Sequence, residues 1–216
     1  MLTPFDWQEG IGRRAQYVEG RLSHGAPAVA ISLPDGILIA SLRRQSPKIY
    51  EVYDRMAMVA IGQQSDIEAL RVAAVDWSHQ EGFNRGEAEV TIQRLVTGLS
   101  TSLKRSFSDF NTSPLTAISL FVEVGDSPAD DRYFVLQYDG DYEIKSGCAA
   151  LAASPAKSAD LQLELEGLVL SSQKTALARL EELLTKQFGE EGAAFEAVLV
   201  SRSQDRENRF TTLPLG

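Results

Sequence analysis

Short apolar runs separated by turn residues fill the chain from residue 28 to residue 62. The runs within 28-AVAISLPDGILIAS-41 flank Asp35-Gly36, a pair of turn residues that predicts a β-hairpin. A second hairpin is predicted from 48-KIYEVYD-54 and 56-MAMVAIG-62. Pro27 has no N–H to give to a strand ladder, so it suits only the beginning of the first strand.

Helices are predicted on both sides of these hairpins. The first is expected over about 4–24, with Thr3 as its N-cap and Gly25 at its C-terminal stop. A capping box, 65-SDIE-68, predicts the start of a second helix that extends to about Gly82.

Two further helices are predicted at about 87–108 and 172–188. The first of these has apolar residues on one side: Ile92, Leu95, Val96, Leu99, Leu103 and Phe107. Ser146-Gly147-Cys148 leads into small residues that are typical of a helix. The remaining strands are expected at 115–124, 132–139, 142–145, 195–202 and 209–213.

Strands that occur in runs, separated by paired helices, argue against a parallel βαβ sheet. They favour an α+β fold in which two antiparallel sheets are stacked and covered by helices, a four-layer arrangement. No internal repeat or linker divides the chain, so residues 1–216 are expected to form a single domain.

Composition narrows the possible partners. The chain has 21 Lys+Arg against 30 Asp+Glu and a formal net charge of −9, without a long basic run. Nucleic acid is therefore an unexpected partner, because nucleic-acid binders carry a basic face. No apolar run reaches the ~18–20 residues of a membrane span, and no secretory segment opens the sequence. With Cys148 as its one cysteine, the chain is expected to be cytoplasmic and without a membrane partner.

Candidate chemical groups are few. His24 and His79 are the two histidines, and both are expected at the surface or at a helix end, since no set of metal ligands surrounds them. Neither a phosphate-binding nor a dinucleotide-binding glycine motif occurs, and neither does a GxSxG elbow, so we expect no metal and no cofactor. Cys148 is more simply a packed residue than a nucleophile.

Other charged residues are expected at the surface. Asp66, Asp76 and Glu81 are interpreted as one solvated helix face rather than as paired acid–base carboxylates. The pairs Arg13-Arg14 and Arg43-Arg44 are interpreted as surface or subunit-contact charges.

The order and shape of these segments resemble the proteasome core family, and within it the non-catalytic α-type subunits of bacterial and archaeal proteasomes. The resemblance covers most of the chain: the segment TPFDWQEGIGRRAQYVEGRLSHG, the hairpin AVAISLPDGILIAS, PKIYEVYDRMAMVAIG, SDIEALRVAAVDWSHQEG and SGCAAL. It implies the αββα sandwich of N-terminal-nucleophile hydrolases, with an additional N-terminal helix.

The resemblance also implies that the catalytic site is missing. In catalytic β-type subunits a propeptide ends in glycine, and the threonine that follows it begins the first strand and attacks the peptide carbonyl. The matching residues here are Gly25-Ala26-Pro27, and Ala26 has no hydroxyl. Leu42 stands where the β-type subunits carry an acid. Of the catalytic residues of β-type subunits, only the lysine is retained here, as Lys48. A site without its nucleophile retains little catalysis.

By resemblance, the chain is expected to form a homo-oligomeric ring, usually of seven, that stacks on a catalytic β-type ring and admits protein substrates. Helix 4–24 would pack on the ring face, and the residues before it, Met1, Leu2 and Thr3, would form the entry gate. The tyrosine-containing gate motif of archaeal and eukaryotic relatives is absent there.

Lys48 matches a lysine that lies in a pocket between neighbouring α-type subunits. There it would bind the C-terminal carboxylate of the tail of an ATPase or another activator. The alternative is a lysine that starts a strand with its ammonium in water, where an ion pair is worth only ~0–1 kcal/mol.

Two other functions remain open. One is a divergent self-compartmentalising peptidase with its own nucleophile, for which Ser23, Ser32 and Cys148 are the candidates. The other is a ring scaffold without a protease partner. We expect the chain itself to be non-catalytic and to be part of a threonine-type endopeptidase complex.

Overall fold

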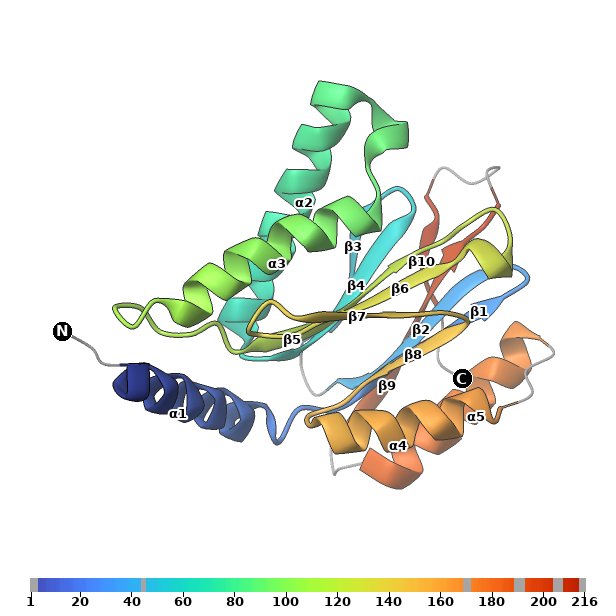
Figure 1. Cartoon of the computed structure of the whole chain (residues 1–216). Coiled ribbons are helices and arrows are strands. Elements are labelled where there is room, and N and C mark those ends of the chain that lie inside the picture. The colour runs from blue at the N-terminus through green and yellow to red at the C-terminus, as the bar shows by residue number, and fades with distance from the viewer. Residues whose placement is uncertain (1–3, 44–45, 169–171, 189–192, 204–207, 214–216) are drawn as a thin grey trace.

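The computed structural model describes residues 4–43, 46–168, 172–188, 193–203 and 208–213. Two antiparallel sheets lie face to face (Figure 1). The first has the order β10-β9-β2-β1-β8 and the second the order β3-β4-β5-β6-β7. The first sheet contains β1 (Ala28–Leu33), β2 (Gly36–Arg43), β8 (Cys148–Leu151), β9 (Ala194–Ser201) and β10 (Phe210–Thr212). The second contains β3 (Ile49–Tyr53), β4 (Met56–Gly62), β5 (Ala117–Glu123), β6 (Arg132–Leu136) and β7 (Tyr142–Lys145).

Helices cover the outer face of each sheet (Figure 1). α2 (Gln64–Arg85) and α3 (Ile92–Ser108) pack on the second sheet, and a short 3-10 turn, Glu87–Glu89, joins them. α4 (Pro155–Glu166) and α5 (Gln173–Phe188) pack on the first sheet. The predicted α+β four-layer sandwich is confirmed.

Burial on both faces explains why the central strands have little polar character. Side chains alternate between the two faces of a strand. In β2, Ile37 and Ile39 point into the core between the sheets, whereas Leu38, Ala40 and Leu42 point toward the α4/α5 layer. All five are at most 2% exposed. A strand with helices on one side and a sheet on the other must therefore be apolar at nearly every position.

The N-terminal helix α1 (Pro4–Leu22) joins the fold through its last turns. Val18 and Leu22 are buried and belong to the core between the two sheets. Gly25, which follows the helix, lies so close to Ile61 that an added Cβ would meet its Cγ2 at 1.9 Å. A glycine is therefore required at the passage from α1 to β1.

The first half of α1 has a second attachment near the end of α3. Arg14 donates to the carbonyl oxygens of Thr112 and Ser106 at 2.9 and 3.3 Å, and its guanidinium lies 5.5 Å from the centre of the Phe110 ring. The ring of Trp7 meets Phe110 edge-on. These contacts hold α1 alongside the molecule (Figure 1).

Two predictions from local patterns are wrong. The residue that caps α2 is Gln63, whose side chain makes no capping bond to the helix backbone, so 65-SDIE-68 is not a capping box. The Asp66 carboxylate instead accepts the N–H of Thr116, next to the beginning of β5, at 2.8 Å. The small residues after Gly147 form strand β8 rather than a helix, because they pair with β1 in the register Ala28↔Leu151 to Ile31↔Cys148.

Other boundaries agree with expectation within a few residues. α1 ends at Leu22 rather than at about residue 24, and α2 continues to Arg85 rather than ending near Gly82. α3 begins at Ile92, and all six apolar residues predicted for its inner side are buried. Thr3, the expected N-cap of α1, lies outside the described residues. No helix in the described part of the chain has the length and apolar character needed to span a membrane.

Candidate functional site

The sandwich brings the predicted positions of the degenerate catalytic site into one region. Ala26 precedes β1, Leu42 lies at the end of β2, and Lys48 precedes β3. The Lys48 Nζ donates to the Ala26 carbonyl oxygen at 3.3 Å. Ala26 and Leu42 both belong to the apolar cluster between the first sheet and α5.

The surroundings of Leu42 are suited to a hydrocarbon side chain. Leu42 is 2% exposed and is paired in register with Phe195 of β9. An ionised carboxylate in such a place would need buried hydrogen-bond donors to offset its desolvation. The apolar environment therefore fits the leucine and gives this position no acid–base chemistry.

A largely buried carboxylate, that of Glu196, lies beside Lys48 and is not indicated by any sequence motif. Its Oε1 accepts the backbone N–H of Lys48 at 2.8 Å, and its Oε2 lies 3.6 Å from the Nε of Arg43. Burial raises the pKa of this carboxyl, and the bond from the Lys48 N–H and the charges of Arg43 and Lys48 oppose that rise. The signal in the sequence was a lone acid inside the apolar strand FEAVLVSR.

The neighbouring hydroxyl, Ser41, has a structural role. Ser41 is fully buried, and its Oγ donates to the Pro27 carbonyl oxygen at 2.8 Å. The bond joins β2 to the residue that opens β1. A hydroxyl whose proton is held by a backbone carbonyl has no base to activate it as a nucleophile.

The alternative nucleophiles are also engaged or inert. Ser23 Oγ donates to the Gly20 carbonyl oxygen at 2.8 Å, and Ser32 Oγ lies 2.6 Å from the hydroxyl of Tyr133. Cys148 is buried at the start of β8. Burial, assisted by the charge of Glu166, raises the pKa of its thiol, although a bond from Gln162 opposes the rise. A thiol with a raised pKa is a poor nucleophile.

Both histidines are exposed. His24 lies in the turn after α1, and His79 is in α2 with its Nδ1 2.9 Å from the Val75 carbonyl oxygen. Within the described residues, His, Cys, Asp and Glu form no group of three or more that could hold a metal ion.

The expectation of one solvated acidic face on α2 is partly wrong. Asp76 is exposed. Glu81, by contrast, is only 14% exposed at its side chain and pairs with Arg94 and Arg85. Asp66 bonds to the backbone before β5. These two acids attach α2 to its neighbours and do not form an acid–base pair.

The predicted basic pairs are also more than surface charge. Arg13 pairs with Glu9, and both are exposed, whereas Arg14 fixes α1 to the residues after α3. Arg43 faces Glu196. Arg44, Met1, Leu2 and Thr3 lie outside the described residues.

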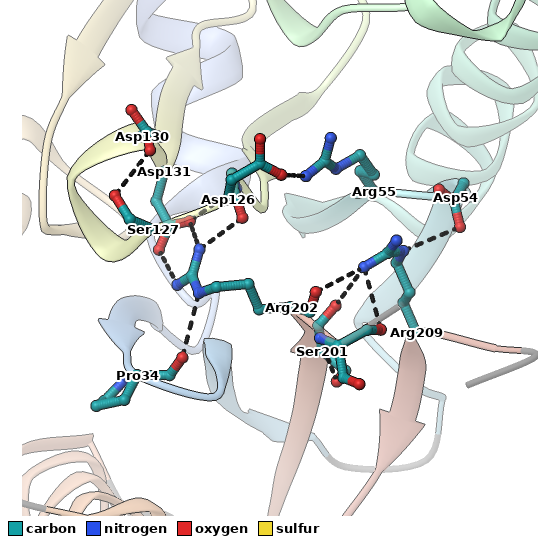
Figure 2. A network of polar contacts seen from close by, with 12 residues as sticks. Pro34, Asp54, Arg55, Asp126, Ser127, Asp130, Asp131, Ser201, Arg202 and Arg209 are labelled. Atoms are coloured by element: carbon teal, nitrogen blue, oxygen red, sulfur yellow. Dashed lines mark hydrogen bonds and ion pairs between the residues drawn. The ribbon is translucent and has the colours of Figure 1, made fainter. Parts of the chain in front are cut away.

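Figure 2 shows a second polar network, made by the turns of both sheets. Arg202 forms two bonds to Asp131, at 2.7 and 3.0 Å, and also donates to the backbone oxygens of Leu33, Pro34 and Gly125. The Asp131 side chain is fully buried and that of Arg202 is 11% exposed. The network links the β1–β2 turn, the end of β9 and the β5–β6 connection.

Arg209 extends this network to the β3–β4 turn. It pairs with Asp54 and donates to the backbone oxygens of Ser201, Arg202 and Ser203 (Figure 2). Within the described residues, the side chains of Arg202 and Arg209 bond to backbone carbonyl oxygens and to the carboxylates of Asp131 and Asp54. The network therefore stabilises the fold and carries no catalytic arrangement.

A cleft of about 850 Å³ lies between the end of α1, the β6–β7 connection and the beginning of α4. Its carboxylates are Glu19, Asp139, Asp141 and Glu143. Ala26, Leu42 and Lys48 do not line it. The cleft is thus separate from the degenerate site.

Two antiparallel sheets between two helical layers, preceded by a helix that contributes to the core, define an αββα sandwich of the N-terminal-nucleophile type. The chain matches no family model. It is similar to a protein named proteasome subunit alpha from Nocardioides, with 27% identity over 93% of this chain and 80% of that protein.

Proteins of the same name from Xylanimonas cellulosilytica and Acidothermus cellulolyticus are 31% and 30% identical. These matches cover 64% and 70% of this chain, and 57% and 66% of the two relatives' own length. The chain belongs to the family of proteasome α subunits.

Proposed function

We propose that this chain is a non-catalytic α-type subunit in the ring of a proteasome, and that it controls the entry of protein substrates to a catalytic β-type ring. The observation that carries the proposal is the similarity to a protein named proteasome subunit alpha over 93% of the chain. We further propose that residues 1–216 act as one domain, that the ring is a homo-oligomer of seven, and that it works in the cytoplasm.

The local structure supports a non-catalytic role. The residue at the nucleophile position, Ala26, has no hydroxyl, and Leu42 is enclosed by apolar side chains. The ammonium of Lys48 bonds to the Ala26 backbone rather than to a side-chain nucleophile. A peptidase using Ser23, Ser32 or Cys148 is not favoured, because each of them is held by a hydrogen bond or buried.

Docking of an activator by the C-terminal tail of an ATPase belongs to the same proposal. Lys48 supports it because the residue is partly buried at the beginning of β3, where an ion pair with a carboxylate is screened less than at an open surface. The gate remains assigned to Met1, Leu2 and Thr3 by resemblance alone.

The test combines the chain with the β-type subunit of the same organism. We expect the chain alone to form rings without peptidase activity. The mixture should form stacked rings that hydrolyse peptides, and a threonine-directed inhibitor should block this hydrolysis. Ala26→Thr in the isolated chain should give no activity, because Leu42 remains where the acid belongs. Turnover by the isolated chain, or failure to associate with the β-type subunit, would contradict the proposal.

A further inference from the structure

β7 and β8 are edge strands, one of each sheet, and they lie on the same side of the sandwich. A short turn joins them, and from it they diverge (Figure 1). The cleft of about 850 Å³ lies on this side, because residues of both strands line it together with the end of α1 and the beginning of α4. The free edges of the two sheets therefore meet at one cleft.

The free edge of β8 is already covered by α4. The side-chain oxygen of Gln162 accepts the N–H of Ala150 at 2.9 Å, and its amide donates to the Cys148 carbonyl oxygen at 3.3 Å. The Ser158 Oγ accepts the N–H of Ala152, directly after the strand, at 2.9 Å. Polar side chains of a helix thus take the place of a neighbouring strand, so β8 offers no edge to a further chain.

The free edge of β7 is open. The turn into this strand is closed by a bond from the Gln137 N–H to the Asp141 carbonyl oxygen at 2.8 Å. Bonded positions alternate in an antiparallel ladder, so Glu143 bonds to β6, whereas Tyr142 and Ile144 direct their backbone N–H and C=O groups away from it. Among the described residues, none bonds to these outward groups. Such an edge is a template for pairing with another chain.

The two faces of β7 are chemically different. Ile144 is on the α3 side, opposite Phe134, and is 60% exposed. Glu143 is on the other side, opposite Val135, and lines the cleft. A strand added to β7 therefore meets an apolar residue on one face and a carboxylate on the other.

The cleft combines an excess of negative charge with apolar surface. Four carboxylates line it, against one ammonium, that of Lys145, which pairs with Glu143 at 2.7 Å. Leu22 and Ile118, which belong to the core between the sheets, line it as well. Basic side chains fit such a cleft, because their aliphatic stems cover apolar surface while their charged ends meet carboxylates.

We propose that an extended segment of a partner protein, in which basic and apolar residues alternate, pairs antiparallel with β7. Its apolar side chains pack beside Ile144, and its basic side chains enter the cleft. Main-chain bonds to the edge supply affinity in this mode of recognition, and the alternate side chains supply specificity. The antiparallel direction continues that of the sheet and is the more stable one for each residue. This inference goes beyond the proposed function and does not rest on it.

The experiment uses the full chain and a fluorescent hexapeptide in which lysine and valine alternate, with both termini blocked. In an antiparallel pair, the residue opposite Ile144 shares its face and directs its own N–H toward β7, so the valines should form the ladder. N-methylation of the valines should therefore lower the affinity at least about tenfold, and N-methylation of the lysines should leave it nearly unchanged. A peptide with glutamate in place of lysine should bind at least about tenfold more weakly.

Variants of the chain test the edge and the charge separately. Ile144→Pro removes an outward N–H without removing a bond to β6, and it should lower the affinity about tenfold, whereas Ile144→Val should bind as the wild type does. Asp141→Asn with Glu143→Gln should weaken binding of the lysine peptide and reduce its dependence on salt. Glu181→Gln with Glu182→Gln removes the same charge from the exposed side of α5, away from the cleft, and serves as the control.

Several outcomes contradict this assignment. Equal binding of the lysine and glutamate peptides, equal effects of the two N-methylations, or unchanged binding by Ile144→Pro would each overturn it. Native mass spectrometry of the same variant addresses a different occupant: loss of self-assembly would assign the edge to a second copy of this chain and overturn the partner segment. If Ile144→Pro fails to fold by circular dichroism, the two N-methylated peptides with the wild-type chain still decide the question.

Discussion

At the scale of single residues, the most specific contacts join positions far apart in the sequence. Glu196 meets Lys48 across 148 positions, and Arg202 meets Asp131 across 71. Such pairs have no local spacing, so the sequence alone did not indicate them. By contrast, the packed state of Cys148 was predictable, because a small residue followed by alanines suits a buried segment.

The buried pair of Arg202 and Asp131 gives a prediction for stability. Asp131→Ala should lower the free energy of unfolding by about 3–5 kcal/mol, because it leaves the Arg202 charge buried without its partner. Arg179→Ala removes half of an exposed pair with Glu182 on α5 and should cost only ~0–1 kcal/mol. Urea denaturation of four proteins, the wild type, the two single variants and the double variant, measures the difference. A loss for Asp131→Ala no larger than that for Arg179→Ala would show that the network is not stabilising.

At the scale of elements, helices and strands with a strong hydrophobic period could be predicted from the sequence. Elements whose type or ends depend on tertiary contacts could not. α3 was predicted with its whole buried side, because six apolar residues define one stripe. β8 was missed because small residues buried on both faces show no period of two. The pattern 65-SDIE-68 predicted a capping box, but Asp66 bonds instead to Thr116. That residue is 50 positions away, so no local pattern could indicate the contact.

The beginning of α3 shows how a buried acid makes an element sensitive to pH. The Glu123 carboxylate accepts the N–H of Ile92 at 3.2 Å. Burial raises the pKa of Glu123 above its ordinary value of 4.5, although the bond from Ile92 and the charges of Arg132 and Arg55 oppose the rise. The uncharged form is therefore favoured in the folded state, so the contribution of this group to stability is complete at low pH and declines as pH rises through the raised pKa.

Glu123→Gln should remove this dependence, because an amide oxygen still accepts the Ile92 N–H and carries no charge. Relative to the wild type, the variant should gain stability between about pH 4 and pH 7, by about 1.4 kcal/mol for each unit of pKa elevation. Urea denaturation at both pH values tests this, with the exposed Glu182→Gln as the control. A constant difference between variant and wild type across this range would contradict the prediction.

At the scale of the whole molecule, α1 separates into an anchored side and an open side. Val18 and Leu22 enter the core, whereas Phe5 and Tyr17 remain 73% and 54% exposed. In the proposed ring, we expect a neighbouring subunit to cover these two aromatic side chains. The order of layers was predictable from the order of helices and strands. The orientation of α1 was not, because it depends on Gly25, Arg14 and the residues after α3.

The open side of α1 yields a test of ring formation that spares the core. Phe5→Ser with Tyr17→Ser should leave the monomer folded and shift the α ring toward monomers, because each side chain buried in a contact is worth roughly 1.5–3 kcal/mol. Native mass spectrometry measures the ring population and circular dichroism the fold. Phe83→Ser removes an aromatic residue of α2 that is 92% exposed and serves as the comparison. Full ring assembly by the double variant would show that this side of α1 is not the contact.

The attachment of α1 also fixes when the helix can take its place during biosynthesis. It leaves the ribosome well before its partners: Ser106 and Thr112 hold Arg14, and Tyr138 donates to Glu19. At common rates of translation the helix waits on the order of ten seconds for them. A nascent chain therefore cannot present a fixed α1 to a neighbour until the second sheet has been made. On the proposed ring contact, a chain can join its neighbours through α1 only after residues 106–138 have been made.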